Sequence, residues 1–157
     1  MKPMLKFYKM DPGAFSPEFA TWASACFDLK AFIHPDFPIT SWDSQNNKTT
    51  VSPYMASDLW VDPGYRVLIP TGLIFKIDRL HTIENFSDIT KPQPPLQTFS
   101  IRLHPRSGLS LKRGLILANC EGIVDVDYQE QVFVLLTNIS LLGQVIKKGD
   151  RIAQAEV

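Results

Sequence analysis

The stretch Gln131-Val132-Phe133-Val134-Leu135-Leu136 has the length of one β-strand and is rich in β-branched and aromatic residues. Three further runs have the same character: Arg66 to Ile69, Gly72 to Ile77 and Gly114 to Ala118. Twelve Pro and eight Gly interrupt the chain at short intervals, and no stretch keeps a sustained helical period. We therefore predict an all-β fold, a barrel or sandwich of short strands.

A single domain accounts for the 157 residues. One short helix is expected, with Ser107 as its cap, Leu109 to Lys112 in its turns and Gly114 at its end. Two segments break the even spacing of the strands. We expect residues 33–58, which are polar, and residues 78–95, which are rich in proline, to be long surface insertions.

The charge and cysteine content exclude several classes of function. Lys plus Arg is 16 and Asp plus Glu is 16, so the chain lacks the basic excess of a protein that binds nucleic acid through its phosphates. The two cysteines have no metal-ligand spacing, and they are typical of reduced thiols. Because the N-terminus, Met1 to Met10, alternates Lys with apolar residues and has no continuous apolar run, we expect no membrane span and no signal peptide, and a cytoplasmic protein, in a host cytoplasm if viral.

Two polar stretches point to a nucleotide site. In Pro105-Arg106-Ser107-Gly108, the predicted helix start presents free backbone N–H groups, a hydroxyl and a guanidinium to an anion. Taken alone, this stretch is better explained by a plain strand-to-helix turn with an exposed Arg. In residues 119–128, a turn-rich segment between two strands predicts a β-hairpin, whose backbone groups can hydrogen-bond to a base edge.

Four stretches in order carry a family resemblance: residues 25–31, 105–109, 119–128 and 149–154. They resemble the first four of the five motifs of the trimeric dUTPase family. The resemblance implies a jelly-roll β-barrel, a homotrimer with active sites shared between neighbouring subunits, and Mg²⁺ as cofactor. It also implies hydrolysis of dUTP to dUMP and pyrophosphate by water attack on the α-phosphate.

The resemblance assigns a role to individual residues. Asp125 takes the position of the general base, because a carboxylate can orient a water and accept its proton. Asp28 helps to hold Mg²⁺ through water. The implied substrate-binding residues are Arg106, Ser107, Gly108 and Gln154 for the phosphates, Asn119, Gly122, Ile123 and Val124 for uracil, Tyr128 for the deoxyribose, and Phe133 as a further contact. Asp127 is expected to support the hairpin, and Asp150 and Arg151 to form a turn and an ion pair.

The sequence departs from the family pattern at three places. Cys26 and Glu130 stand where the motifs usually have Gly, and a Glu with positive φ is unfavourable. In the family a Gly-rich fifth motif follows the fourth, and the 157 residues contain no such motif. We therefore expect this chain to bind dUTP but to turn it over slowly.

Two alternatives stay open. A dCTP deaminase of the same fold would need a Glu where Leu135 stands. A regulatory protein on a dUTPase scaffold would use partner contacts of the two insertions.

Overall fold

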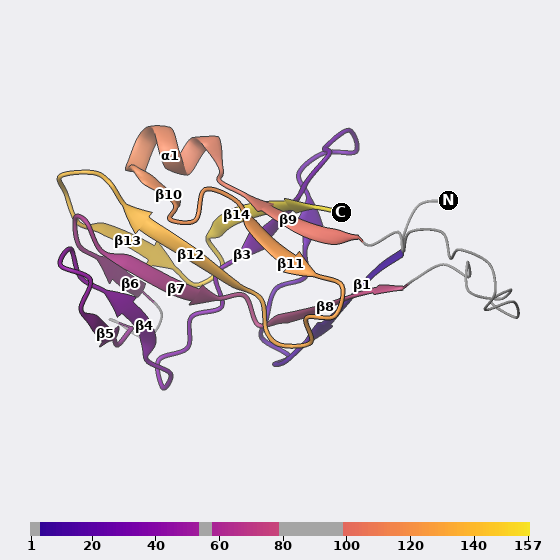
Figure 1. The fold of residues 1–157 in the computed structure, drawn as a ribbon, viewed down its shortest axis with the longest axis horizontal. Helices are drawn as coiled ribbons and strands as arrows, with labels where there is room; N and C mark the ends of the chain where they lie inside the picture. The colour runs from indigo at the N-terminus through magenta and orange to yellow at the C-terminus, as the bar shows by residue number, and fades with distance from the viewer. Residues whose placement is uncertain (1–3, 54–57, 79–98) are drawn as a thin grey trace, which may run out of the picture.

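The computed structural model describes residues 4–53, 58–78 and 99–157 and consists of strands with one short helix, which confirms the all-β prediction (Figure 1). Two five-stranded antiparallel sheets have the orders β10-β12-β7-β4-β5 and β11-β9-β14-β3-β2, and β1-β8 and β13-β6 form two-stranded sheets. The strands are β1 (Met4–Lys9), β2 (Glu18–Phe19), β3 (Phe27–Lys30), β4 (Ile39–Trp42), β5 (Lys48–Val51), β6 (Asp58–Val61), β7 (Arg66–Pro70), β8 (Leu73–Asp78), β9 (Ser100–His104), β10 (Leu115–Leu117), β11 (Gly122–Asp125), β12 (Phe133–Asn138), β13 (Gln144–Lys147) and β14 (Arg151–Glu156).

One continuous apolar core joins the sheets. Along the strands, buried and exposed positions alternate, as in β9, where Ile101 and Leu103 are buried and Arg102 is exposed. The same alternation in β7 and β12 gives each sheet one inward face. Burial of these inward faces is the main force that holds the fold together.

The helix α1 (Ser107–Arg113) ends as predicted but begins differently. Gly114 closes it in the left-handed region with φ 64°, a conformation that glycine adopts without steric cost. The N-cap, however, is Arg106 and not Ser107, and no side chain caps the first turn. Ser107 is therefore the first helical residue, and its exposed hydroxyl is not used by the helix.

The first expected insertion, residues 33–58, contains regular structure. Within it, β4 and β5 form a hairpin that extends the sheet beyond β7, and Ile39 and Ser41 of β4 are buried. The prediction of a surface excursion was wrong here, because the exposed strand β5, Lys48–Val51, is polar and gives no apolar signal. Of the second expected insertion, residues 78–95, all but Asp78 lies outside the described residues.

The two strands that flank residues 119–128, β10 and β12, pair antiparallel as the predicted hairpin requires, but the segment between them contains the further strand β11. Strand β11 pairs with β9, whereas β12 pairs with β10 and β7, so β11 and β12 belong to different sheets. Residues 126–132 connect one sheet to the other (Figure 1). The strands diverge at this crossing, and a pocket opens between them. Within the described ranges, no helix is long and apolar enough to cross a membrane.

Candidate functional site

A cavity of about 360 Å³ lies between β11 and β12. This volume lies within the range of small-molecule sites, which is about 300–1,000 Å³. Six of the predicted site residues line it: Asn119, Gly122, Ile123, Val124, Tyr128 and Phe133. The structure therefore brings together all the residues that were assigned to the base and the sugar.

Leu135, the position where a deaminase would need a Glu, also lines this pocket, together with residues that the sequence did not single out: Leu68, Leu103, Leu117 and Val132. Each belongs to an apolar strand pattern, so nothing distinguished it from an ordinary core residue. Asn119 and Tyr128 are the pocket lining residues with polar side chains. Such a pocket suits a flat, weakly polar ring that is recognised at its edge.

Strand β11 offers backbone groups to that ring. It is the edge strand of its sheet, with β9 as its one neighbour. In an antiparallel edge strand, alternate N–H and C=O groups point away from the neighbour and stay unpaired by the sheet. Because Gly122, Ile123 and Val124 line the pocket, this free edge lies beside it.

The chain turns sharply after β11, and this turn carries Asp125 and Tyr128. The Tyr128 N–H donates to the Asp125 carbonyl over 3.1 Å, which fixes the two residues relative to each other. Asp125 is the last residue of β11 and is exposed, and it directly follows Val124, which lines the pocket. Tyr128 is 39% exposed, and its hydroxyl donates to the Gln131 carbonyl over 2.9 Å.

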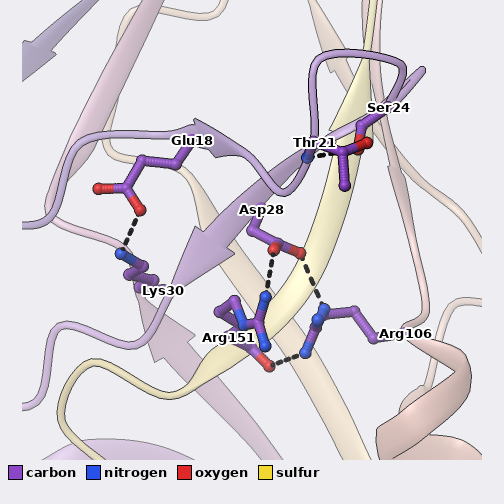
Figure 2. A network of polar contacts seen from close by, with 7 residues as sticks. All are labelled: Glu18, Thr21, Ser24, Asp28, Lys30, Arg106 and Arg151. Atoms are coloured by element: carbon purple, nitrogen blue, oxygen red, sulfur yellow. Dashed lines mark hydrogen bonds and ion pairs between the residues drawn. The ribbon is translucent and has the colours of Figure 1, made fainter.

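A second polar cluster surrounds Asp28, whose side chain is only 7% exposed (Figure 2). Its Oδ1 accepts from the Arg106 Nε over 2.8 Å, and its Oδ2 accepts from the Arg151 Nη1 over 3.2 Å. Arg106 also donates from Nη1 to the Arg151 carbonyl over 3.3 Å. One carboxylate thus aligns two guanidiniums, and the cluster carries one net positive charge.

A β-bulge explains how Arg151 reaches Asp28. The register of β14 against β3 shifts between Arg151 and Ala153, so that Ile152 and Ala153 are both buried. Without the extra residue, strict alternation would turn Arg151 toward the core. The expected ion pair of Arg151 is confirmed, and so is the turn of Asp150, whose Oδ2 accepts from the Lys147 N–H over 3.0 Å.

The remaining predicted phosphate residues lie near this cluster. The Gln154 side chain donates from Nε2 to the Pro105 carbonyl over 3.1 Å, directly before Arg106. Gln154 is also the register partner of both Asp28 and His104. Ser107 and Gly108 open α1 next to Arg106, and both are exposed.

The pocket and the Asp28 cluster lie at separate strands of one sheet. Register places Asp28, Gln154 and His104 in one row across the strands, and Phe27, Ala155 and Leu103 in the next row. Side chains of adjacent rows point to opposite faces. Leu103 therefore faces the core and Asp28 faces outward, and Ile123, the register partner of Arg102 in the row after Leu103, faces outward as well. The strands β9 and β14 lie between the pocket strand β11 and the Asp28 strand β3.

Two side chains near the cluster have shifted pKa values. A hydrogen bond and ion pair with Lys30, whose Nζ lies 2.8 Å from Oε2, lower the pKa of the Glu18 carboxyl. Burial, reinforced by the negative charges of Glu156 and Asp28, raises the pKa of the Cys26 thiol.

Glu130, at the start of the segment that leads to β12, does not have positive φ. The loop thus accommodates Glu130 without the backbone conformation that a glycine would allow.

Comparison with known proteins supports one family. The dUTPase family model matches residues 53–155. The chain is 32% identical over 146 residues to the deoxyuridine 5'-triphosphate nucleotidohydrolase of Treponema pallidum, covering 93% of this chain and 73% of that protein. It is 33% identical over 149 residues to the protein of the same name from Chlamydia caviae, covering 95% and 74%. The chain spans 58% of the length of the relative with that name from Bartonella bacilliformis.

Solved structures show the same fold. The Streptococcus mutans dUTPase superimposes with a TM-score of 0.59 at 20% identity, covering 96% of this chain and 91% of that chain. A dUTPase of Staphylococcus bacteriophage 80alpha, solved as a G164S mutant with dUpNHpp, gives a TM-score of 0.63 at 17% identity, covering 98% and 80%. These neighbours share the jelly-roll β fold that was expected. By the match of the family model and the identity to its curated relatives, the chain belongs to the dUTPase family.

Proposed function

We propose that this protein hydrolyses dUTP to dUMP and pyrophosphate, which limits the uracil available for DNA and supplies dUMP. The observation that carries the proposal is the pocket between β11 and β12, with a free strand edge on one side and Tyr128 on the other. Uracil would pair with the edge of β11 around Ile123 and Val124 and with Asn119, while Tyr128 and Phe133 would pack against the sugar and base. The family match supports this reading.

In the proposed reaction, Asp125 orients a water and accepts its proton as the oxygen attacks the α-phosphorus. The bond between the α-phosphorus and its bridging oxygen to the β-phosphate breaks, and the electron pair leaves with pyrophosphate. Arg106 stabilises the negative charge that develops on the phosphates, because Asp28 already holds its guanidinium in one orientation. Ser107, Gly108 and Gln154 complete the phosphate contacts.

Magnesium fits this site as an ion that arrives with the triphosphate. In the described ranges no group of three or more acidic, His or Cys side chains could hold a metal, and both oxygens of Asp28 face guanidiniums. Mg²⁺ keeps several waters and binds phosphate oxygens, so Asp28 would contact it through water. When bound, the ion neutralises phosphate charge and polarises the α-phosphate.

The placement of the two groups supports a homotrimer with shared sites. The strands β9 and β14 separate the pocket strand β11 from the Asp28 strand β3. We therefore propose that the pocket of one protomer is completed by Arg106 and Asp28 of a neighbour.

The two free thiols, Cys26 and Cys120, suit a reducing, cytoplasmic environment.

The activity is tested by pyrophosphate release from dUTP, dTTP, UTP and dCTP. We expect dUTP to be preferred and Asp125→Asn to abolish turnover while an imido analogue of dUTP still binds. Asp127→Asn is the matched control, because Asp127 is exposed in the same turn and has no assigned role in catalysis or substrate binding. Full activity of Asp125→Asn would refute the assigned base.

Ammonia release from dCTP tests the deaminase alternative. Leu135 lines the pocket where a deaminase needs a proton carrier, and among the lining residues no carboxylate is present. We expect no ammonia.

Mixing two inactive variants tests the shared site. Asp125→Asn supplies an intact Arg106, and Arg106→Ala supplies an intact Asp125. If protomers share sites, co-refolded mixtures regain part of the activity, and sedimentation gives a trimer mass. A monomer mass with no recovery would contradict the shared site while leaving the family assignment intact.

A further inference from the structure

We infer that Gln131 is a positioning residue for substrate recognition. It attaches the turn that carries Tyr128 to the corner between β7 and β8, at Thr71 and Gly72. This inference rests on the proposed function, since it concerns which residues hold the sugar-contacting tyrosine in place. Residues 126–132 cross between the sheets without strand pairing, so their position depends on a few specific contacts.

Gln131 is bonded in two directions. Its backbone carbonyl accepts from the Tyr128 hydroxyl over 2.9 Å, and its side-chain Oε1 accepts from the Gly72 N–H over 2.8 Å. Neither contact alone fixes Tyr128 to the body of the fold. Together they form a continuous chain of hydrogen bonds from the tyrosine, through one residue, to a buried backbone amide.

The corner that receives Gln131 is rigid. Gly72 is buried with φ 70°, and a Cβ on it would lie 2.7 Å from the Ala14 Cβ. The fully buried Thr71 donates from Oγ1 to the Val132 carbonyl over 2.6 Å, and its N–H donates to the same carbonyl over 3.2 Å. The Val132 N–H in turn donates to the Leu73 carbonyl over 2.8 Å. Gln131 is thus bonded to Gly72, and the next residue, Val132, is bonded to Thr71 and Leu73 on either side of it.

Loss of the Gln131 contact would affect the part of the site around Tyr128. Tyr128 lines the pocket, and its N–H is bonded to the carbonyl of Asp125, the proposed base. Loss of the Gln131 side-chain acceptor would leave the buried Gly72 N–H unsatisfied and would remove the side-chain contact between the turn and the corner, so that only the backbone bonds of Val132 would hold it there. The sugar-contacting ring would then lose its fixed position, while the strands on either side would keep their pairing.

Three variants test the role of Gln131. Gln131→Leu removes the acceptor at similar size, Gln131→Glu retains an acceptor for the Gly72 N–H, and Gln129→Leu changes an exposed glutamine of the same segment. For Gln131→Leu we expect the KM for dUTP to rise about tenfold, with kcat changed less, and the preference for dUTP over UTP to fall about tenfold. Gln131→Glu and Gln129→Leu should stay within about threefold of the wild type.

Amide exchange separates this inference from the proposed function. We expect the Gly72 N–H to exchange slowly in the wild type and in Gln131→Glu, and fast in Gln131→Leu. Fast exchange in the wild type, unchanged KM and selectivity in Gln131→Leu, or equal losses in Gln131→Leu and Gln131→Glu would each overturn the role of Gln131. If the wild type hydrolyses no dUTP, the proposed function fails, but the exchange measurement still decides whether Gln131 holds the turn.

Discussion

Replacing Asp28 by Asn tests whether one buried carboxylate holds the two arginines in place. The substitution keeps the size of the side chain, so it leaves no cavity, but it removes the negative charge between Arg106 and Arg151. The Asp28 side chain is 7% exposed, against 23% for Arg106 and 49% for Arg151. The two ion pairs therefore differ in how strongly solvent screens them.

The expected loss of stability follows from these exposures. A hydrogen bond to a charged group contributes about 1.5–3 kcal/mol, and this value applies to the shielded pair with Arg106. The pair with Arg151 is half-exposed and contributes at most about 1 kcal/mol. We expect the free energy of unfolding to fall by about 2–3 kcal/mol, which lowers Tm by roughly 4–12 °C for a chain of this size.

The assay is urea unfolding at a fixed protomer concentration, because assembly would make stability depend on concentration. The matched control is Glu18→Gln: Glu18 is the register partner of Asp28, but its pair with Lys30 has a Glu18 side chain that is 63% exposed. We expect Glu18→Gln to have a small effect that disappears in high salt, whereas the Asp28→Asn effect persists. Equal unfolding midpoints for Asp28→Asn and the wild type would refute the reasoning.

Three other changes probe separate parts of the fold. Asn138→Ala should cost roughly 2–4 kcal/mol in chemical unfolding, because the fully buried Asn138 amide donates to the carbonyls of Val61 and Leu142, and both of these bonds would be lost. Gly72→Ala should lower Tm strongly, because a Cβ there would lie 2.7 Å from another Cβ at φ 70°, whereas Gly108→Ala, with no atom within 4 Å of the added Cβ, should leave Tm unchanged. Iodoacetamide at pH 8 should label the exposed Cys120 before Cys26, whose pKa is raised by burial, and equal labelling rates followed by mass spectrometry would contradict that order.

The sequence predicted the strands and most of the pocket because both depend on local patterns. The apolar run that became β12 and the turn residues around Gly122 are readable without knowing their partners. The partner of β11 was not readable: alternation identifies a strand and its faces, but it does not say which strand lies beside it. The predicted hairpin was right for the flanking strands β10 and β12, but it missed that the segment between them crosses to the other sheet.

The polar parts of the fold were harder to predict. Strand β5 is exposed and consists of Lys, Thr and Val, so the segment was taken for a loop. The bulge that turns Arg151 outward adds one residue to the pairing, and such an addition leaves no mark in composition. The link from Gln131 to Gly72 joins residues 59 positions apart, which only the folded chain reveals.

The free edge of β11 has a consequence for how this protein tolerates mutation. Recognition through main-chain N–H and C=O groups is encoded by every amino acid except proline, which lacks the N–H. Substitutions at Ile123 or Val124 would reshape the pocket walls but leave the hydrogen-bonding pattern of the strand intact. If β11 pairs with the base as proposed, point mutations at Ile123 or Val124 would therefore change its selectivity little.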